Sequence, residues 1–492
     1  MEKITKLVHS LSNREVKLFY KYNALSGKKT NNLKIRLFEI AKQNPEISDI
    51  EAAKILGKKV DAAFSMLKHR LQEDIFKVLV FTVDEAKFFS KTFKARYEVF
   101  KLLAQSTLLD SRNLKQLSTE AIQKADRIAQ EYELLSSRVI INEILINSHQ
   151  AAQGFRTYNK FKETVFSDIS KQQALATGQD LFKQLIVPNM FAANRKKSQA
   201  EIAKNSAEQL EQLNKIHPSV RLNFLLLRSQ MEYAEITQDF QTYYNTASEF
   251  LKLVTNNPPV STSDNIGGAN MLLAESSLRL HNWDNSKIFI NESEKYFFKN
   301  SNNYITLMSI KYSMLVQTKS YEDAYQLVQE IRQLKSIKRG SFQYSKWIYY
   351  EANIKFLQGD FQGSMNLLKR HSFLKSDKSG WRIGFKILEM LCIIEIGHYD
   401  WLPYRLETFR KLLKDISKEN VSRPTLIHKI LLKLTRENFD FSTTDRKTFA
   451  ELNLLRTDKG EYYRDPISYE IIPFDTWWDD KMATIKNRKK AE

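Results

Sequence analysis

Apolar side chains recur at three- and four-residue intervals along almost the whole chain. In residues 348–368, for example, Ile348, Ala352 and Phe356 keep one helical face, and Phe361 and Leu368 keep the next. This 3.6-residue period is the pattern of amphipathic α-helices. With only 13 Gly and 9 Pro in 492 residues, little room is left for strand-and-turn architectures or long linkers. The pattern predicts an all-α protein.

A short turn separates the two helices of this stretch, at residues 357–364, LQGDFQGS. Gly359 can end the first helix in a left-handed conformation. Asp360 can cap the N-terminus of the second helix through its side chain. Phe361 then lies where a large ring can wedge between two antiparallel helices. The stretch therefore predicts a helical hairpin.

Weaker copies of this turn recur along the second half of the chain. Four other turns carry an aromatic residue at the matching position: Phe240, Trp283, Tyr321 and Tyr399. The successive spacings, with Phe361 included, are 43, 38, 40 and 38 residues. A period of this length is typical of arrays of helical hairpins, in which each hairpin buries its apolar face against the next. We expect an α-solenoid.

The first 86 residues predict a separate helical unit with a motif of its own. In residues 49–75 a short helix ends at Leu56-Gly57 and a longer one begins near Val60. Two alanines at positions 52 and 53 would permit a close helix crossing. Apolar residues spaced along the second helix predict its buried stripe: Val60, Phe64, Leu67 and Leu71. The segment resembles the helix-turn-helix of bacterial sigma-factor-like DNA readers.

That resemblance implies a set of residues that face phosphates or base edges, because the front of the second helix enters the major groove. They are Lys58, Lys59, Ser65, Lys68 and Arg70. The acidic residues Asp61, Glu73 and Asp74 share this region and would repel phosphate. Few side chains are positioned for bidentate readout of bases. An ordinary three-helix packing unit is the alternative.

The rest of the chain divides into three parts. Residues 87–218 predict degenerate helical hairpins, including a helix pair around residues 155–185 that is broken at Val187-Pro188, and residues 219–420 hold the clear repeats. Residues 421–492 contain one more helix and then an aromatic segment: Tyr462, Tyr463, Tyr469, Phe474, Trp477 and Trp478. Because a solenoid needs its last apolar face covered, we expect this segment to be a docked cap. An exposed recognition segment is the alternative.

The chain is strongly basic, and its charge is unevenly distributed. The net charge is +19, and residues 1–101 carry +9 of it, with 21 Lys and Arg against 12 Asp and Glu. Such asymmetry favours an acidic partner, with nucleic acid as the obvious class. Solvated lysine faces are an equally good interpretation.

No signal peptide and no run of about 18 apolar residues is present, so a cytoplasmic location is expected.

The chemistry-bearing residues do not form a catalytic pattern. The eight histidines are scattered, without the spacing of metal ligands, and the phosphate, dinucleotide and nucleophile motifs are absent. The single cysteine, Cys392, lies in an apolar helix and excludes both a disulfide framework and thiolate zinc clusters. We expect a buried core thiol there, no metal, no cofactor and no enzymatic activity.

The turns at residues 321–324, 359–361 and 397–399 resemble those of tetratricopeptide repeats. The period is longer than the usual one of about 34 residues, and the proline that normally ends each repeat is missing. The whole chain resembles uncharacterised cytoplasmic tetratricopeptide-like proteins of Bacteroidota, through residues 11–19, 125–132 and 474–478. That resemblance implies an α-solenoid and a protein-binding role, with no catalytic residues.

The leading hypothesis is therefore a scaffold or adaptor that holds a peptide or helix of another protein in its concave groove. Polar residues on the first helices of the repeats are the candidate groove positions: Asn270, Lys311, Asn353 and Arg382. The first alternative is a DNA-binding regulator that uses the helix-turn-helix-like segment. The second is binding of RNA or the ribosome by the basic surface. The oligomeric state stays open.

Overall fold

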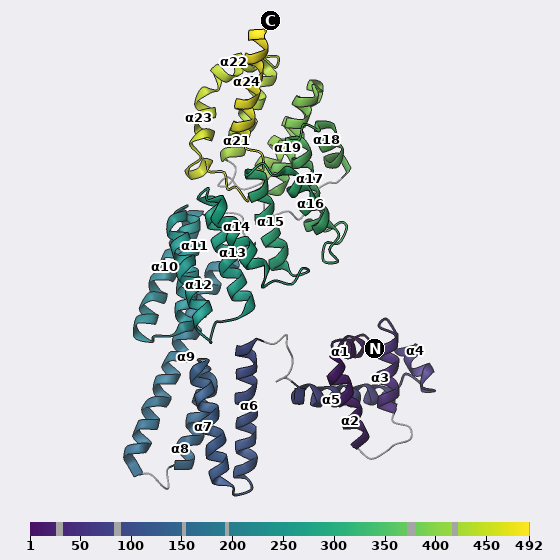
Figure 1. Cartoon of the computed structure of the whole chain (residues 1–492), viewed down its shortest axis with the longest axis vertical. Helices are drawn as coiled ribbons and strands as arrows, with labels where there is room; N and C mark the ends of the chain where they lie inside the picture. The colour runs from purple at the N-terminus through teal and green to yellow at the C-terminus, as the bar shows by residue number, and fades with distance from the viewer. Residues whose placement is uncertain are drawn as a thin grey trace. The chain divides into compact units, whose positions relative to one another are not determined.

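The computed structural model describes residues 1–25, 33–82, 90–149, 154–191, 196–370, 380–415 and 422–491. Over these residues the chain is entirely helices and their connections, without a β-strand. From α8 onward, each helix packs mainly on helices next or next but one to it in the sequence. These two observations confirm the predicted all-α solenoid (Figure 1). The chain divides into two compact units, Met1–Tyr132 and Glu133–Glu492.

Seven helices make up the first unit. They are α1 (Glu2–His9), α2 (Asn13–Leu25), α3 (Leu33–Gln43), α4 (Asp49–Ile55), α5 (Ala62–Thr82), α6 (Lys91–Asp110) and α7 (Lys115–Glu131). Helices α1 to α5 share one core, in which Phe19 stacks on Phe38 with ring centroids 4.3 Å apart. Helices α6 and α7 form a hairpin.

The predicted buried stripe of the second helix in the motif is correct only in part. Phe64 and Leu71 are buried in the core of α1 to α5, and Leu67 packs against its edge. Val60 is 51% exposed, so its assignment to the stripe is wrong. The reason is that α5 begins only at Ala62, after Asp61 accepts a hydrogen bond from the Phe64 backbone N–H at 2.9 Å. Val60 therefore lies in the turn.

The second unit is a longer series of helices. They are α8 (Leu135–His149), α9 (Gly154–Phe191), α10 (Lys196–Ile216), α11 (Val220–Ile236), α12 (Phe240–Asn256), α13 (Ser263–Arg279), α14 (Trp283–Glu294), α15 (Asn302–Gln317), α16 (Tyr321–Arg332), α17 (Phe342–Leu357), α18 (Phe361–Arg370), α19 (Trp381–Ile396), η2 (Tyr399–Trp401), α20 (Leu402–Asp415), α21 (Ser422–Arg436), α22 (Phe441–Lys447), α23 (Phe449–Thr457), η4 (Gly460–Tyr462) and α24 (Phe474–Ala491).

The expected break at Val187-Pro188 is wrong, since α9 continues through Pro188 to Phe191. Loss of one backbone hydrogen bond at a proline does not by itself end a helix that is held by packing.

The five predicted turns share the position of their aromatic residue, but a side-chain cap is present only before α12, α14 and α18. Each aromatic residue is the first residue of the helix that follows its turn: Phe240, Trp283, Tyr321, Phe361 and Tyr399. Gly359 has φ of +83°, and the Gly363 N–H donates to the Asp360 carboxylate at 2.8 Å, as helix ending and capping require. The Phe361 ring lies 5.0 Å from that of Phe356, on the last turn of α17.

The structure adds a sixth turn of this kind at residues 438–441. Asn438 and Phe439 both have positive φ, Asp440 caps α22, and Phe441 is its first residue. Phe441 occupies the aromatic position, so α21 and α22 make another hairpin. In the register of the other turns, Phe439 takes the left-handed position two residues before Phe441.

Candidate functional site

Two of the four predicted groove residues have no accessible surface to offer a partner. Asn353 is 1% exposed, and its amide donates to the Tyr349 carbonyl at 2.8 Å. Asn270 is 6% exposed and donates to the Ile266 carbonyl at 2.9 Å. Their assignment to an accessible groove is therefore wrong. Both amides hydrogen-bond the preceding turn of their own helix.

At Asn353 the physical reason is that the chain covers this surface itself. The C-terminal segment, defined here as residues 458–491, passes along the first helices of the repeats. The Tyr349 hydroxyl donates to the Tyr469 carbonyl at 2.6 Å, and the Trp477 indole N–H donates to Glu395 at 2.8 Å. A Cβ atom on Gly384 would lie 2.2 Å from the Tyr469 carbonyl oxygen, so only glycine permits this approach. The aromatic segment is docked, as expected.

One anchor of this segment is Arg423 of α21, which is 5% exposed. Its guanidinium forms a bidentate pair with Glu470, with N–O distances of 2.8 and 2.9 Å, and also contacts Asp475. Its remaining nitrogen donates to the backbone carbonyls of Leu455 and Tyr462. A charge this deeply enclosed is stable only because every donor direction is met.

A second anchor is Arg279 of α13, whose side chain is 4% exposed. Three carboxylates lie 2.8 to 2.9 Å from its Nη2: Glu235 of α11, Glu275 of α13 and Asp465 of the C-terminal segment. Burial and the neighbouring carboxylates raise the pKa of Glu275 to about 7 against the pull of Arg279. This cluster fixes the segment to the first clear repeats.

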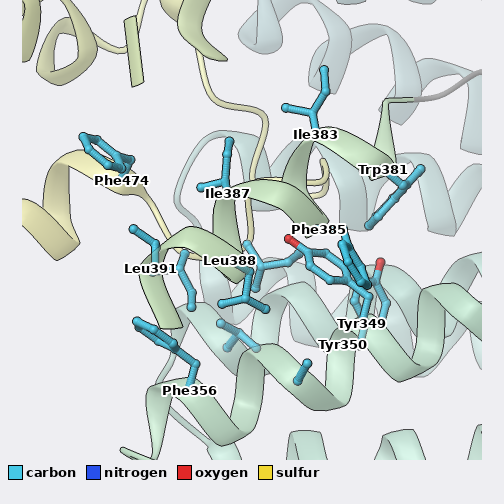
Figure 2. Packing of buried hydrophobic residues seen from close by; sticks show 14 of the residues in the cluster. Tyr349, Tyr350, Phe356, Trp381, Ile383, Phe385, Ile387, Leu388, Leu391 and Phe474 are labelled. Atoms are coloured by element: carbon cyan, nitrogen blue, oxygen red, sulfur yellow. The ribbon is translucent and has the colours of Figure 1, made fainter. Parts of the chain in front are cut away.

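Apolar side chains fix the segment to the later repeats. Phe474 and Trp478 are fully buried in the main core, together with Ile471, Ile472 and Trp477. Figure 2 shows side chains of α17 and α19 gathered with Phe474 in this core. Five such side chains contribute on the order of 10 kcal/mol to holding the segment in the fold. The inner surface is therefore part of the fold and no open site.

The space left under the segment supports this conclusion. A cavity between Tyr349, Gly384 and Glu470 measures only about 10 Å³. That volume has room for one water molecule at most.

A larger concavity lies between the second helices α14 and α16, with α15 as its floor. Its volume is about 350 Å³, within the usual range for ligand pockets. The lining residues follow helical spacing: Lys287, Ile290 and Asn291 of α14, Lys311, Met314 and Leu315 of α15, and Asp323, Gln326, Leu327 and Glu330 of α16. We call this concavity the α14–α16 pocket.

The α14–α16 pocket includes one predicted groove residue, Lys311, whose ammonium lies 3.3 Å from Glu294. The fourth predicted residue, Arg382, is exposed on α19 and does not line the pocket. Sequence reasoning missed the acidic wall on α16. Its signal was the spacing of Asp323, Gln326 and Glu330, which places three polar side chains on one face of an amphipathic helix.

In the first unit, the predicted nucleic-acid-binding residues lie at the turn between α4 and α5. Lys58, Lys59, Ser65 and Arg70 are exposed, and Gly57 makes the turn with φ of +64°. Lys68 differs from them. Its ammonium pairs with Asp49 at 2.6 Å and lies over the Phe64 ring, so it is held within the helical unit.

Groups of side chains suited to metal binding are not found in the described ranges. No cluster of three or more His, Cys, Asp or Glu there can hold a metal ion. Cys392 is fully buried, as expected for a core thiol, and burial raises its pKa to about 12. A thiol with such a pKa is not a nucleophile at neutral pH.

Membrane-spanning helices are likewise not found among the helices described here, none of which is both long and apolar enough.

No protein-family model matches the chain, and a search of curated proteins gives no significant match. The functional argument therefore depends on the geometry of these surfaces.

Proposed function

We propose that this chain is a non-enzymatic helical-repeat scaffold that binds a segment of another protein in the α14–α16 pocket. The observation that carries the proposal is the pocket itself, a concavity of about 350 Å³ with an apolar floor and polar walls. Apolar floors with a few placed polar groups are typical of binding sites. Its walls are helices held in a continuous core, so the site is formed before a partner arrives.

The C-terminal segment supports a polypeptide as the ligand. Along the inner surface, the repeats hold an extended stretch of their own chain through buried arginines and aromatic side chains. The same kind of helical surface can therefore hold an extended or helical stretch of a partner. Because the inner surface is filled, the partner is assigned to the pocket between the second helices.

Site-specific photocrosslinking tests the proposal on the full chain. A benzophenone amino acid placed at Gln326, in the pocket wall, should form covalent adducts with a defined protein in extracts of the source cell. The same group placed at the exposed Lys252 of α12, outside the pocket, is the matched control. Equal adducts at both positions, or adducts with nucleic acid alone, would contradict the proposal.

The absence of enzymatic activity, a cytoplasmic location and membership in the tetratricopeptide-like group of Bacteroidota are parts of the same proposal. Six turns that share a left-handed residue two positions before an aromatic residue support the repeat assignment. Fractionation of cells that produce the chain tests the location.

DNA binding by α4 and α5 is a second candidate function. The observation that favours it is the exposure of Lys58, Lys59, Ser65 and Arg70 around the start of α5. In a helix-turn-helix, the start of the second helix meets the major groove. Lys68 forms an ion pair with Asp49, so it is not available for one of the expected phosphate contacts.

Titration of the full chain with duplex DNA at several salt concentrations tests this candidate. DNA binding should weaken as salt rises, because phosphate contacts release counterions. The double variant Lys58→Glu with Lys59→Glu should abolish it, whereas Lys6→Glu on α1 should change it little. Absence of binding even at low salt would rule the candidate out.

The ratio of absorbance at 260 and 280 nm of purified protein tests the third possibility, RNA or ribosome binding.

A further inference from the structure

The charged side chains of the α14–α16 pocket are separated by sign. Lys287 lies on α14, one wall of the pocket, and Asp323 and Glu330 lie on α16, the other wall. Lys311 lies on α15, the floor, and pairs with Glu294 of α14. Apolar side chains, such as Met314 and Leu327, lie between the two walls. The pocket thus has a basic wall, an apolar floor and an acidic wall.

Most of these charges have no counterion within the protein. Lys311 is paired with Glu294. For Lys287, Asp323 and Glu330, the structure records no ion pair within 4 Å in the part of the chain that it describes. Unpaired charges of both signs around one concavity are the arrangement expected where a ligand supplies the counterions.

We propose that the pocket selects a polypeptide segment that carries an acidic and a basic side chain on either side of an apolar one. The acidic side chain pairs with Lys287, the apolar one fills the floor, and the basic one pairs with Asp323 or Glu330. This inference rests on the proposed function, because it names the chemistry of the partner that the scaffold binds.

The two walls also exclude other ligand classes. Nucleic acid and anionic lipid surfaces present negative charge alone, and the carboxylates of α16 would repel both. A purely basic segment would pair with the carboxylates of α16 but would leave Lys287 without a counterion. Only a segment with both signs satisfies both walls.

The distance between Asp323 and Glu330 on α16 sets the spacing of the basic side chains that a bound polypeptide segment can use. Asp323 and Glu330 are seven residues apart, which is two helical turns or roughly 10 Å along the helix. One basic side chain reaches either carboxylate, and a segment with two basic side chains one or two turns apart can reach both. The pocket volume of about 350 Å³ then accepts one or two large apolar side chains.

Selection from a random peptide library displayed on phage, with the full chain as target, tests the inference. The enriched peptides should contain an acidic and a basic residue that flank an apolar one. Each of the variants Lys287→Glu and Asp323→Lys should weaken their binding about tenfold or more, because a close charge pair becomes a repulsion. A peptide whose acidic residue is exchanged for Lys should regain affinity for Lys287→Glu.

Lys252→Glu on α12 and Glu201→Lys on α10 are matched controls, since they make the same charge changes at exposed positions outside the pocket. Both should leave peptide binding unchanged. Enrichment of peptides without the two signs, unchanged binding by both pocket variants, or no enrichment at all would overturn the inference. The proposed scaffold function would still stand if crosslinking at Gln326 captures a protein, so the two failures are distinguishable.

Discussion

At the scale of single residues, two buried arginines hold the C-terminal segment in place. Arg279 brings together carboxylates of α11, α13 and the C-terminal segment, and Arg423 of α21 binds two carboxylates of that segment. An ion pair in water contributes little to stability, but a buried charge that loses its partner is strongly destabilising. The energetic importance of these arginines therefore follows from their burial rather than from their charge alone.

Replacement of Arg423 measures this effect. Arg423→Ala leaves Glu470, 3% exposed, as an uncompensated buried carboxylate, so the free energy of unfolding should fall by about 3–5 kcal/mol. Urea denaturation of the full chain gives the value. Arg410→Ala is the control: this arginine is 41% exposed in its pair with Glu407, and the change should cost far less. Equal losses in both variants would refute the anchor role of Arg423.

Glu275 makes the second unit sensitive to pH. Its pKa is raised from 4.5 to about 7 by burial, with Glu235, Asp465 and Glu232 adding to the effect and Arg279 opposing it. A carboxyl whose pKa is higher in the folded state binds its proton more tightly there. Its stabilising contribution is thus complete below about pH 4.5 and is lost as the pH rises through about 7.

Thermal unfolding between pH 5.5 and 8 checks this sign. The Tm of the unmodified chain should fall with rising pH, and Glu275→Gln should flatten that fall because an amide does not titrate. Glu407→Gln, which changes an exposed carboxyl with a lowered pKa, should leave the slope as it is. A slope that survives in Glu275→Gln would assign the pH dependence to another group.

At the scale of elements, the recurring unit is the turn between paired helices. Its backbone has a left-handed residue whether or not glycine is present, and an aromatic residue follows two positions later. The left-handed residues of the five predicted turns are Gln238, His281, Lys319, Gly359 and Gly397. Non-glycine residues take this conformation at a cost of about 1–2 kcal/mol, which helix packing offsets.

Exchange of glycine at two of these turns tests the cost. Lys319→Gly should stabilise the chain by about 0.5–1 kcal/mol, because the relief of strain exceeds the extra entropy of glycine in the unfolded chain. Gly359→Ala should destabilise it by about 1 kcal/mol, although the added Cβ meets no neighbouring atom. Opposite signs in urea denaturation are the expected result, and equal signs would show that the turns differ in conformation.

At the scale of the whole molecule, the chain closes its own inner surface. In the second unit, α17 and α19 are buried almost along their entire length, because hairpins flank them and the C-terminal segment covers them. A solenoid normally exposes this surface to partners. Here it has become core, and the free concavity lies between the second helices α14 and α16.

Truncation of the most central side chain of the segment tests its role as core. Trp478 is fully buried, so Trp478→Ala should cost about 3–5 kcal/mol and lower the Tm of the second unit. Phe298→Ala removes another aromatic ring, but one that is 82% exposed, and it should cost less than about 0.5 kcal/mol. A small effect at Trp478 would mean that the segment is a detachable cover.

The sequence alone determined the helical class and the positions of five turns, because both are local properties. Helical periodicity and capping residues act within about one turn of the chain, so Gly359, Asp360 and Phe361 could be interpreted without any neighbour. The docking of the aromatic segment was also predictable, since an array needs a terminal cap.

Tertiary structure decided which surfaces remain free. Asn353 and Lys311 occupy similar polar positions on first helices, yet the first is buried beside the C-terminal segment and the second lines the α14–α16 pocket. The Tyr469 carbonyl pairs with the Tyr349 hydroxyl, one turn from Asn353, and lies more than 100 residues further along the chain. No local pattern encodes this pairing. The accessibility of a side chain depends on what packs against it from elsewhere in the chain, and for that reason only the folded structure could assign the site.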